Sequence, residues 1–352
     1  MKYQHVENVP NINSWEIIDN NCYYASGNLV KVIGKEVSIP IPLPYWGVEF
    51  NPSFFNVFTN RSVNTFFNYQ GKVINTFEEK DFYYYFSDSS FIYYDRVSKR
   101  LMYNDLELLR GKMLSFYIFD DLLFFEKENK IQTINFLSGQ FLWEFSLASL
   151  GKWKNSWDEE RDFEIRHFIG IYNRIIWAFI EIGGFIGLDI ETGELKYHIP
   201  EYDEAIGKTI CKGKDFFRSD YFLNSEKGKI LGMAMDVFIE IDLSQEPPFV
   251  TQYGLQEEFE KYNIKKANDT AEDFVVQDNL LYFYLAEQLR FGILDINTKE
   301  IIYISEPIAV VERDDCFTQL KDLKVSENKV YILDSNHTLH IFEREEQLKI
   351  TT

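Results

Sequence analysis

The residues of this 352-residue chain that could take part in chemistry are few and widely spaced. Of its five histidines, only His337 and His340 come close together, in the run H-T-L-H. On a strand, residues three apart point to opposite faces, so this pair is a poor metal site. The patterns HExxH and GxSxG and the Gly-rich phosphate-binding loops are absent. The sequence therefore predicts no catalytic residue, no metal site and no cofactor.

One repeated acidic feature could bind a cation. An Asp followed by Phe or Leu opens each of five repeated units, at Asp81, Asp162, Asp215, Asp273 and Asp322. If the segments that they open converge, the carboxylates would form an acidic ring that offers oxygen ligands to a cation. Alternatively, each Asp bonds backbone amides where the chain enters a new structural unit. The repetition favours the second interpretation, because a binding site needs few of the copies whereas a folding device needs all of them.

A nine-residue turn pattern also recurs along the chain. D-I-E-T-G-E-L-K-Y begins at Asp189, related frames begin at Asp95, Asn135 and Asp295, and a degraded copy begins at Asp242. The clear copies share Asp or Asn first, Ser or Thr fourth and an aromatic residue ninth. This pattern predicts a β-hairpin in which Asp or Asn bonds the amides of the turn and Gly supplies a positive φ.

The spacing of these frames predicts the architecture. The copies that begin at Asn135, Asp189, Asp242 and Asp295 are 54, 53 and 53 residues apart, which leaves room for four short strands in each unit. Such a repeat is typical of an all-β β-propeller. With weaker hairpins near residues 31 and 342, we expect seven four-stranded blades in a single domain over residues 1–352. The irregular stretch 45–80 leaves six or eight blades open.

The frame D-x-x-[ST]-G-x-x-x-[WY], carried here by NFLSGQFLW and DIETGELKY, resembles the blade repeat of quinoprotein-like (PQQ-like) propellers. That family includes pyrroloquinoline-quinone dehydrogenases and outer-membrane assembly lipoproteins. The resemblance implies a fold and no particular activity. The chain lacks the adjacent cysteine pair of the dehydrogenases and the lipidated N-terminal Cys of the lipoproteins, and Lys99 and Lys299 replace the glycine in two copies.

Charge and cysteine content limit the classes of partner. A net charge of −20 disfavours nucleic acid and membrane surfaces and favours a basic protein, unless it serves only to keep an aromatic-rich chain soluble. The N-terminal residues have no signal-peptide core, and the apolar stretch 175–188 is too short to span a bilayer. Three distant cysteines, Cys22, Cys211 and Cys316, are expected to be reduced thiols of a cytoplasmic protein.

The long segments between the units are the best candidates for a binding surface. Residues 147–163, 200–215, 254–273 and 306–322 carry −8 of the net charge, and in a propeller all four emerge on one side. A short amphipathic helix is expected within 255–267. The predicted partner-binding residues combine acidic and aromatic side chains: Trp153, Trp157, Asp158, Glu159, Glu160, Phe259, Tyr262, Asp314 and Asp315. Alternatively, the aromatic residues only pack these loops onto the disc.

Two functions follow from these observations. The favoured one is a non-catalytic module that binds a basic protein, for example an inhibitor or immunity-type protein that neutralises a toxin. The alternative is an enzyme, such as a hydrolase, lyase or oxidoreductase, with its active site at the mouth of the central channel. Propellers gather site residues from several blades, so the absence of a local motif does not exclude an enzyme.

Overall fold

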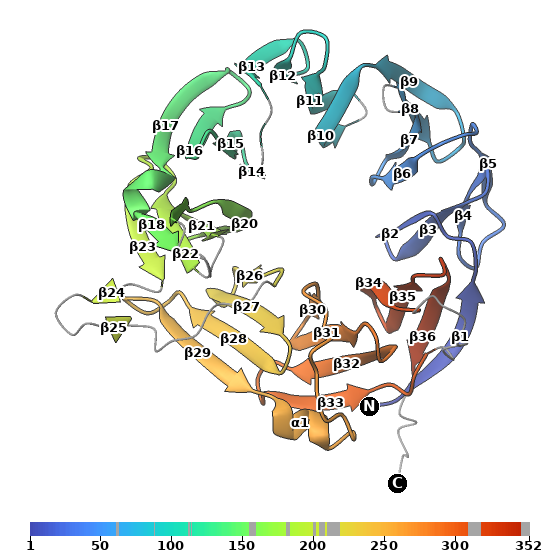
Figure 1. The fold of residues 1–352 in the computed structure, drawn as a ribbon. Coiled ribbons are helices and arrows are strands. Elements are labelled where there is room, and N and C mark those ends of the chain that lie inside the picture. The colour runs from blue at the N-terminus through green and yellow to red at the C-terminus, as the bar shows by residue number, and fades with distance from the viewer. Residues whose placement is uncertain are drawn as a thin grey trace.

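The chain forms a ring of four-stranded antiparallel blades, a β-propeller (Figure 1). The computed structural model describes residues 1–60, 63–87, 89–111, 113, 115–154, 160–180, 184–199, 202–203, 208–209, 219–308 and 318–345. These residues contain eight four-stranded sheets, so the expected number of seven blades is wrong and one of the open alternatives, eight, is correct.

The first four blades follow one another along the chain. They are blade 1, with β2 (Ser14–Ile18), β3 (Asn21–Ser26), β4 (Leu29–Val32) and β5 (Ser38–Pro40); blade 2, with β6 (Gly47–Phe50), β7 (Phe54–Asn60), β8 (Val63–Asn68) and β9 (Val73–Glu78); blade 3, with β10 (Lys80–Ser87), β11 (Ser90–Asp95), β12 (Arg100–Tyr103) and β13 (Leu106–Arg110); and blade 4, with β14 (Phe116–Phe119), β15 (Leu122–Lys127), β16 (Lys130–Asn135) and β17 (Gln140–Ser146).

The remaining blades complete the ring. They are blade 5, with β20 (Ile165–Tyr172), β21 (Ile175–Ile180), β22 (Gly184–Asp189) and β23 (Leu195–Ile199); blade 6, with β26 (Phe222–Asn224), β27 (Lys229–Ala234), β28 (Val237–Asp242) and β29 (Phe249–Gly254); blade 7, with β30 (Val275–Gln277), β31 (Leu280–Leu285), β32 (Arg290–Asp295) and β33 (Glu300–Ile304); and blade 8, with β34 (Leu320–Ser326), β35 (Lys329–Asp334), β36 (Leu339–Arg344) and β1 (Tyr3–Val9).

Short elements occupy the connections between blades. They are the 3-10 turn η1 (Leu147–Leu150), the hairpin β18 (Lys152–Lys154) and β19 (Glu160–Asp162), the pair β24 (Tyr202–Asp203) and β25 (Lys208–Thr209), and the helix α1 (Gln256–Glu260). The predicted helix within 255–267 is therefore present. In the described part of the chain, no helix has the length and apolar character needed to cross a membrane.

The ring is closed by the N-terminal strand. β1 pairs antiparallel with β36 from Tyr3–Arg344 to Val9–Leu339, so the first strand of the chain becomes the outermost strand of the last blade. The second half of the hairpin expected near residue 342 lies outside the described residues, and the first half, β36, pairs with β1. In Figure 1, β1 runs along the outer side of β36.

The repeated frame forms turns with the predicted chemistry. The Oδ1 atom of Asp189 accepts hydrogen bonds from the backbone N–H groups of Glu191 and Thr192 at 2.9 and 3.0 Å. Asp95, Asn135 and Asp295 accept bonds from their own turns in the same way. Gly193 has φ +72°, as the glycine of the frame was predicted to have.

The aromatic residue at position nine joins neighbouring blades. Trp143 of blade 4 donates its indole N–H to the carbonyl of Ile190, in the frame turn of blade 5, at 2.9 Å. Tyr197 of blade 5 likewise donates its hydroxyl to Glu246, in the corresponding turn of blade 6, at 2.6 Å. In blades 4 and 5 the frame therefore caps its own hairpin and contacts the following blade, which is a physical reason for its repetition.

Blade 2 carries a shorter version of the same turn. Asn68 accepts hydrogen bonds from the N–H groups of Gln70 and Lys72, and Gly71 follows with φ +80°. The glycine stands where the frame has Ser or Thr, and the turn is closed without the rest of the pattern. The pattern therefore missed this blade, which lies in the irregular stretch 45–80.

Blade 3 places its frame differently from the others. In blades 4 to 7 the frame turn joins the third strand to the fourth, whereas the frame that begins at Asp95 joins β11 to β12, the second and third strands. Because successive antiparallel turns alternate between the two faces of the disc, the Asp95 turn lies on the opposite face from the frame turns of blades 4 to 7.

Apolar side chains between adjacent blades form the core. The middle strands are buried on both sides and read as continuous apolar runs, as in β21 (IIWAFI) and β31 (LLYFYL). Between blades 2 and 3 the core is built of aromatic rings. Phe66, for example, contacts Phe77, Phe82 and Phe91 at centroid distances of 5.2 to 6.3 Å. The high aromatic content is thus used in packing between blades.

Candidate functional site

The segments that connect one blade to the next share one face of the disc. Each blade begins with its innermost strand and ends with its outermost strand, so four antiparallel strands return the chain to the face on which it started. We call this side the connection face. It carries the inter-blade segments and the turns between second and third strands. The opposite side, the turn face, carries the turns between first and second strands and between third and fourth strands.

Most of the predicted partner-binding residues belong to connection segments whose details the structure does not describe. Trp157, Asp158, Glu159, Asp314 and Asp315 lie outside the described residues, as does the side chain of Trp153 in β18. Glu160 opens β19 and is exposed, within the segment between β17 and β20.

The aromatic residues around α1 hold the connection segment onto blade 7. Phe259 is fully buried and its ring contacts that of Phe283 edge-on at 5.8 Å. Tyr262 is partly buried and donates its hydroxyl to the carbonyl of Ile301 in β33 at 3.0 Å. These two residues serve packing, which was the alternative interpretation, and Phe259 offers no surface to a partner.

Acidic side chains of the same segment remain on the surface. Glu257 and Glu260 of α1 are exposed. Glu258 instead forms hydrogen bonds within the protein. Its carboxylate accepts them from the Lys261 ammonium at 2.6 Å and from the N–H of Ile301 at 3.2 Å. The segment 254–273 as a whole carries a net charge of −3 and is described throughout.

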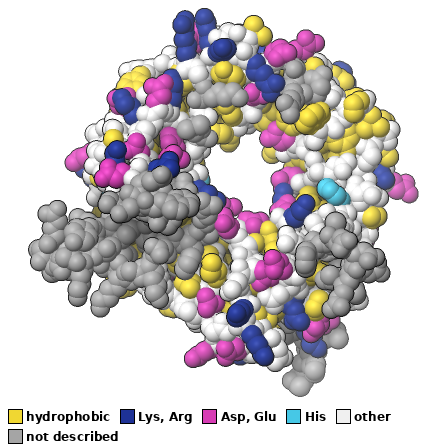
Figure 2. All heavy atoms as spheres, viewed as in Figure 1, with side chains coloured by type: hydrophobic (Ala, Val, Ile, Leu, Met, Phe, Trp, Pro, Cys, Tyr) yellow, Lys and Arg dark blue, Asp and Glu magenta, His cyan; other side chains and the backbone are white. Residues whose placement is uncertain are grey.

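Carboxylates also border the central channel. Figure 2 shows a hole through the disc with acidic side chains at its rim. Asp322 lies on the innermost strand β34, and Asp273 lies two residues before β30. Burial raises the pKa of Asp273, and the carboxylates of Asp220 and Glu272 raise it further, although the hydrogen bond from Tyr284 at 2.8 Å opposes the rise. Burial likewise raises the pKa of Asp322, against the opposing effect of Lys324.

The five unit-opening Asp residues have different surroundings. Asp81 forms an ion pair with Arg96, Asp273 accepts a bond from the Tyr284 hydroxyl, and Asp322 lies beside the backbone amide of its neighbour. Asp162 ends β19, three residues before the first strand of its blade, with the Lys152 ammonium 4.0 Å from its carboxylate, and Asp215 is outside the described residues. Among the residues that the structure describes, no three His, Cys, Asp or Glu side chains are grouped to hold a metal ion.

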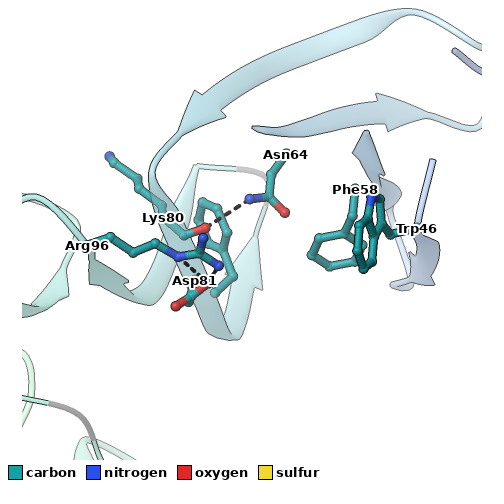
Figure 3. A pocket seen from close by; sticks show the side chains of 7 residues that line it. Trp46, Phe58, Asn64, Lys80, Asp81 and Arg96 are labelled. Carbon is teal, nitrogen blue, oxygen red and sulfur yellow. Dashed lines mark hydrogen bonds and ion pairs between the residues drawn. The ribbon is translucent and has the colours of Figure 1, made fainter. Parts of the chain in front are cut away.

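A pocket on the connection face lies between blades 2 and 3. Its volume is about 230 Å³, and its lining combines three aromatic residues with four polar or charged ones: Trp46, Phe58, Asn64, Lys80, Asp81, Phe82 and Arg96. Figure 3 shows Trp46 and Phe58 side by side, facing the ion pair of Asp81 and Arg96 across the pocket. Trp46 is 68% exposed, although its backbone N–H is fixed to the carbonyl of Phe58 at 2.7 Å.

The ion pair fixes the guanidinium of Arg96 in this pocket. The Nε and Nη2 atoms of Arg96 both donate to Oδ1 of Asp81, with the Nε bond at 2.9 Å. The hydrogen bond to Asp81 raises the pKa of Arg96 above its usual value, so the group stays charged. Sequence reasoning missed this site, although one signal was present: position two of the frame is Arg96 here and apolar in the other four copies.

Comparisons with known proteins support the fold. No protein-family profile matches the chain, and no curated protein gives a significant sequence match. Solved structures that it resembles include BamB from Moraxella catarrhalis, a PQQ-like repeat propeller, with 11% identity and a TM-score of 0.58 over 97% of this chain and 100% of that one. Sqt1 from Saccharomyces cerevisiae has 10% identity and a TM-score of 0.59 over 97% and 99%. The computationally designed protein Ika8 has 11% identity and a TM-score of 0.53 over 97% and 98%.

These similarities define the class of protein. The chain is an eight-bladed β-propeller whose resemblance to quinoprotein-like propellers holds at the level of the fold. At 10–11% identity, the solved structures assign no activity to it.

Proposed function

We propose that this chain is a non-catalytic propeller that binds a basic protein through its connection face. The observation that carries the proposal is the exposure of Glu160, Glu257 and Glu260 on connection segments, which share one face, in a chain of net charge −20. Exposed carboxylates on these segments attract a basic partner over long range and accelerate its association at low salt.

The same face offers apolar anchors for such a contact. Leu43 and Trp46 lie on the segment between β5 and β6 and are 64% and 68% exposed. The segment is held by the bond from Trp46 N–H to Phe58 and by the Asn13 amide, which donates to the Tyr45 hydroxyl at 2.8 Å. Rigid, exposed Trp side chains are typical of residues that dominate binding energy in protein interfaces.

One concrete form of this function is inhibition. A basic toxin or nuclease uses a positively charged surface to reach its own anionic substrate, and an acidic propeller face would cover that surface. In this case the chain would act as an inhibitor or immunity protein. This inhibitory function is inferred from charge complementarity. Direct capture of the partner would identify it.

The test compares two charge-reversal variants of equal charge change. Glu160→Lys with Glu257→Lys alters the connection face, whereas Asp105→Lys with Glu226→Lys alters exposed residues of the turn face. The wild type and both variants are immobilised, exposed to source lysate at 50 and 500 mM salt, and the bound proteins are identified by mass spectrometry. The low-salt condition preserves charge attraction and the high-salt condition screens it.

The proposal expects one basic protein on the wild type at low salt and its release at high salt. The connection-face variant should bind it at least about tenfold more weakly, while the turn-face variant should retain it. Recovery of nothing basic, or equal loss with both variants, would overturn the proposal. Binding of the purified partner, measured by calorimetry with the same variants, completes the comparison.

A further inference from the structure

The pocket between blades 2 and 3 has the size of a site for a single residue. Its volume of about 230 Å³ falls below the roughly 300–1,000 Å³ of pockets that hold drug-sized ligands and cofactors. It opens on the connection face, which is the face proposed to bind a protein. An occupant of this size is one amino-acid residue of a partner or a small acid of the same dimensions.

Arg96 differs from the residue type that the sequence frame has at position two in its other copies. At this position of the frame Phe136, Ile190, Leu243 and Ile296 are apolar, but their turns lie on the turn face. The Asp95 turn joins the second and third strands, so it brings Arg96 to the connection face. On the connection face the guanidinium pairs with Asp81 and also lines the pocket, where a ligand with a hydrogen-bond acceptor can contact it.

The guanidinium is positioned to bind a second anion. Asp81 takes the Nε and Nη2 donors through one oxygen, and Arg96 keeps 35% of its side chain exposed. The Nη1 atom lies on the other arm of the planar guanidinium. A second carboxylate can therefore accept hydrogen bonds from that side of the group. The lining also holds a second cation, Lys80, whose ammonium lies 4.1 Å from the centroid of the Tyr93 ring.

The local charge of the pocket is opposite to that of the chain. Among the residues that the structure describes, two cations and one carboxylate line it, in a protein of net charge −20. Figure 3 shows the Lys80 ammonium pointing away from Trp46, so direct contact with a ligand at the aromatic side falls to Arg96. The ligand must therefore carry a negative group for Arg96 and an apolar group for Trp46 and Phe58.

We propose that this pocket binds an apolar carboxylate, specifically the C-terminal residue of a protein partner. A C-terminal residue with an apolar side chain carries both groups on one Cα: the carboxylate pairs with Arg96 and the side chain packs on Trp46 and Phe58. An internal Asp or Glu has the carboxylate without the apolar group. This inference rests on the proposed function, because it supplies one contact of the protein-binding face.

The test uses short defined ligands. Binding of acetyl-Gly-Gly-Phe as the free acid, of the same peptide as its C-terminal amide, and of free N-acetylphenylalanine is measured by titration calorimetry and by chemical-shift changes of Trp46. The acid should bind at least about tenfold more tightly than the amide, because the amide removes the charge-assisted bond to Arg96. The peptide acid should also bind more tightly than N-acetylphenylalanine, since it adds backbone contacts.

Three variants localise the binding. Arg96→Gln should weaken binding of the peptide acid at least about tenfold. Trp46→Ala should weaken binding of both the acid and the amide. Arg110→Gln, an exposed arginine of blade 3 outside the pocket lining, should leave the affinity unchanged. If Arg96→Gln does not fold, as judged by circular dichroism, Trp46→Ala and the comparison of acid with amide still decide the question.

Equal affinity for acid and amide, or no effect of Trp46→Ala, would overturn the inference. Equal affinity for N-acetylphenylalanine and the peptide would overturn the assignment to a partner's C-terminus and assign the pocket to a free small acid. These failures are distinct from failure of the proposed function. A salt-sensitive partner that is lost with Glu160→Lys and Glu257→Lys but retained by Trp46→Ala would leave the proposed function standing while removing this contact.

Discussion

The ammonium of Lys299 lies 2.8 Å from the carboxylate of Glu240, so the frame turn of blade 7 is tied to blade 6. Lys229 contacts the other oxygen of the same carboxylate at 2.8 Å, and the Lys299 ammonium also lies 4.9 Å from the centroid of the Tyr253 ring. Lys299 occupies the glycine position of the frame with φ 65°. A Lys in this left-handed conformation costs roughly 1–2 kcal/mol, which its contacts with blade 6 offset.

The two lysines that replace glycine should respond in opposite ways to its restoration. Lys99 has φ 56° and is exposed, so Lys99→Gly should raise the free energy of unfolding by about 0.5 kcal/mol after the entropy of glycine is counted. Lys299→Gly should lower it by about 1 kcal/mol, because the loss of a charged hydrogen bond to a nearly buried carboxylate outweighs the relief of strain. Urea unfolding of both variants provides the measurement, and effects of equal sign would contradict this account.

The contact between Gly193 and Trp143 should tolerate no side chain at the glycine. A Cβ at position 193 would lie 2.5 Å from Cε3 of Trp143, and φ is +72° there. Gly193→Ala should therefore cost more than the roughly 1–2 kcal/mol of left-handed strain alone. Gly27→Ala is the matched control, because φ is +59° and no atom lies within 4 Å of its added Cβ. Thermal melting should show a clearly larger decrease for Gly193→Ala, and equal decreases would rule out the clash.

Stability in acid should depend on Asp334. Burial tends to raise the pKa of this carboxyl, but hydrogen bonds from His340 at 2.9 Å and from the N–H groups of Thr338 and Asn336 outweigh it, so the pKa is lowered. A lowered pKa stabilises the fold above the unfolded-state value of about 3.9, and this contribution is lost as pH falls through the folded-state pKa.

Asp334→Asn should accordingly lower the free energy of unfolding at pH 7 by about 1–3 kcal/mol. The difference between wild type and variant should shrink as pH falls below about 4. Urea unfolding between pH 7 and pH 2.5 measures both. A difference that stays constant over this range would mean that the ionised carboxylate does not stabilise the fold.

Removal of residues 1–9 should open the ring at blade 8. Without β1, β36 becomes an exposed edge whose unpaired backbone groups can pair with another chain. The truncated protein should melt at a lower temperature and form dimers or larger species in light scattering. A synthetic peptide of residues 1–9 should restore the monomer by adding the missing strand. A truncated chain that stays monomeric and equally stable would show that the closing strand contributes little.

The fold could be predicted well from local turn chemistry. The side chain of Asp189 bonds amides two and three residues ahead, so the signal is contained in a few adjacent residues. The number of blades was missed because Asn68 closes its turn with Gly71 and needs neither the Ser or Thr nor the aromatic residue of the pattern. A search for Asn or Asp followed by Gly within three residues would have found it.

The pocket could not be predicted, because its parts become neighbours only in three dimensions. Trp46 lies just before the first strand of blade 2, and Phe58 lies on its second strand. Asp81 and Arg96 belong to blade 3. Their proximity depends on the reversed position of the Asp95 turn, which spacing alone does not reveal. Phe259 shows a second limit of prediction from sequence. An amphipathic helix has the same pattern of apolar residues whether its apolar side faces a partner or the core.

The pairing of β1 with β36 also affects how the protein is made. Val9 and its partner Leu339 are 330 residues apart, so at about 5–20 residues per second β36 leaves the ribosome roughly 15–70 s after β1. During that interval the growing chain is an open arc with an unpaired end, and it needs protection from neighbouring nascent chains. Ring closure therefore has to wait until β36 has been made, so the rate at which β36 pairs with the β1 strand of its own chain should limit the yield of closed rings.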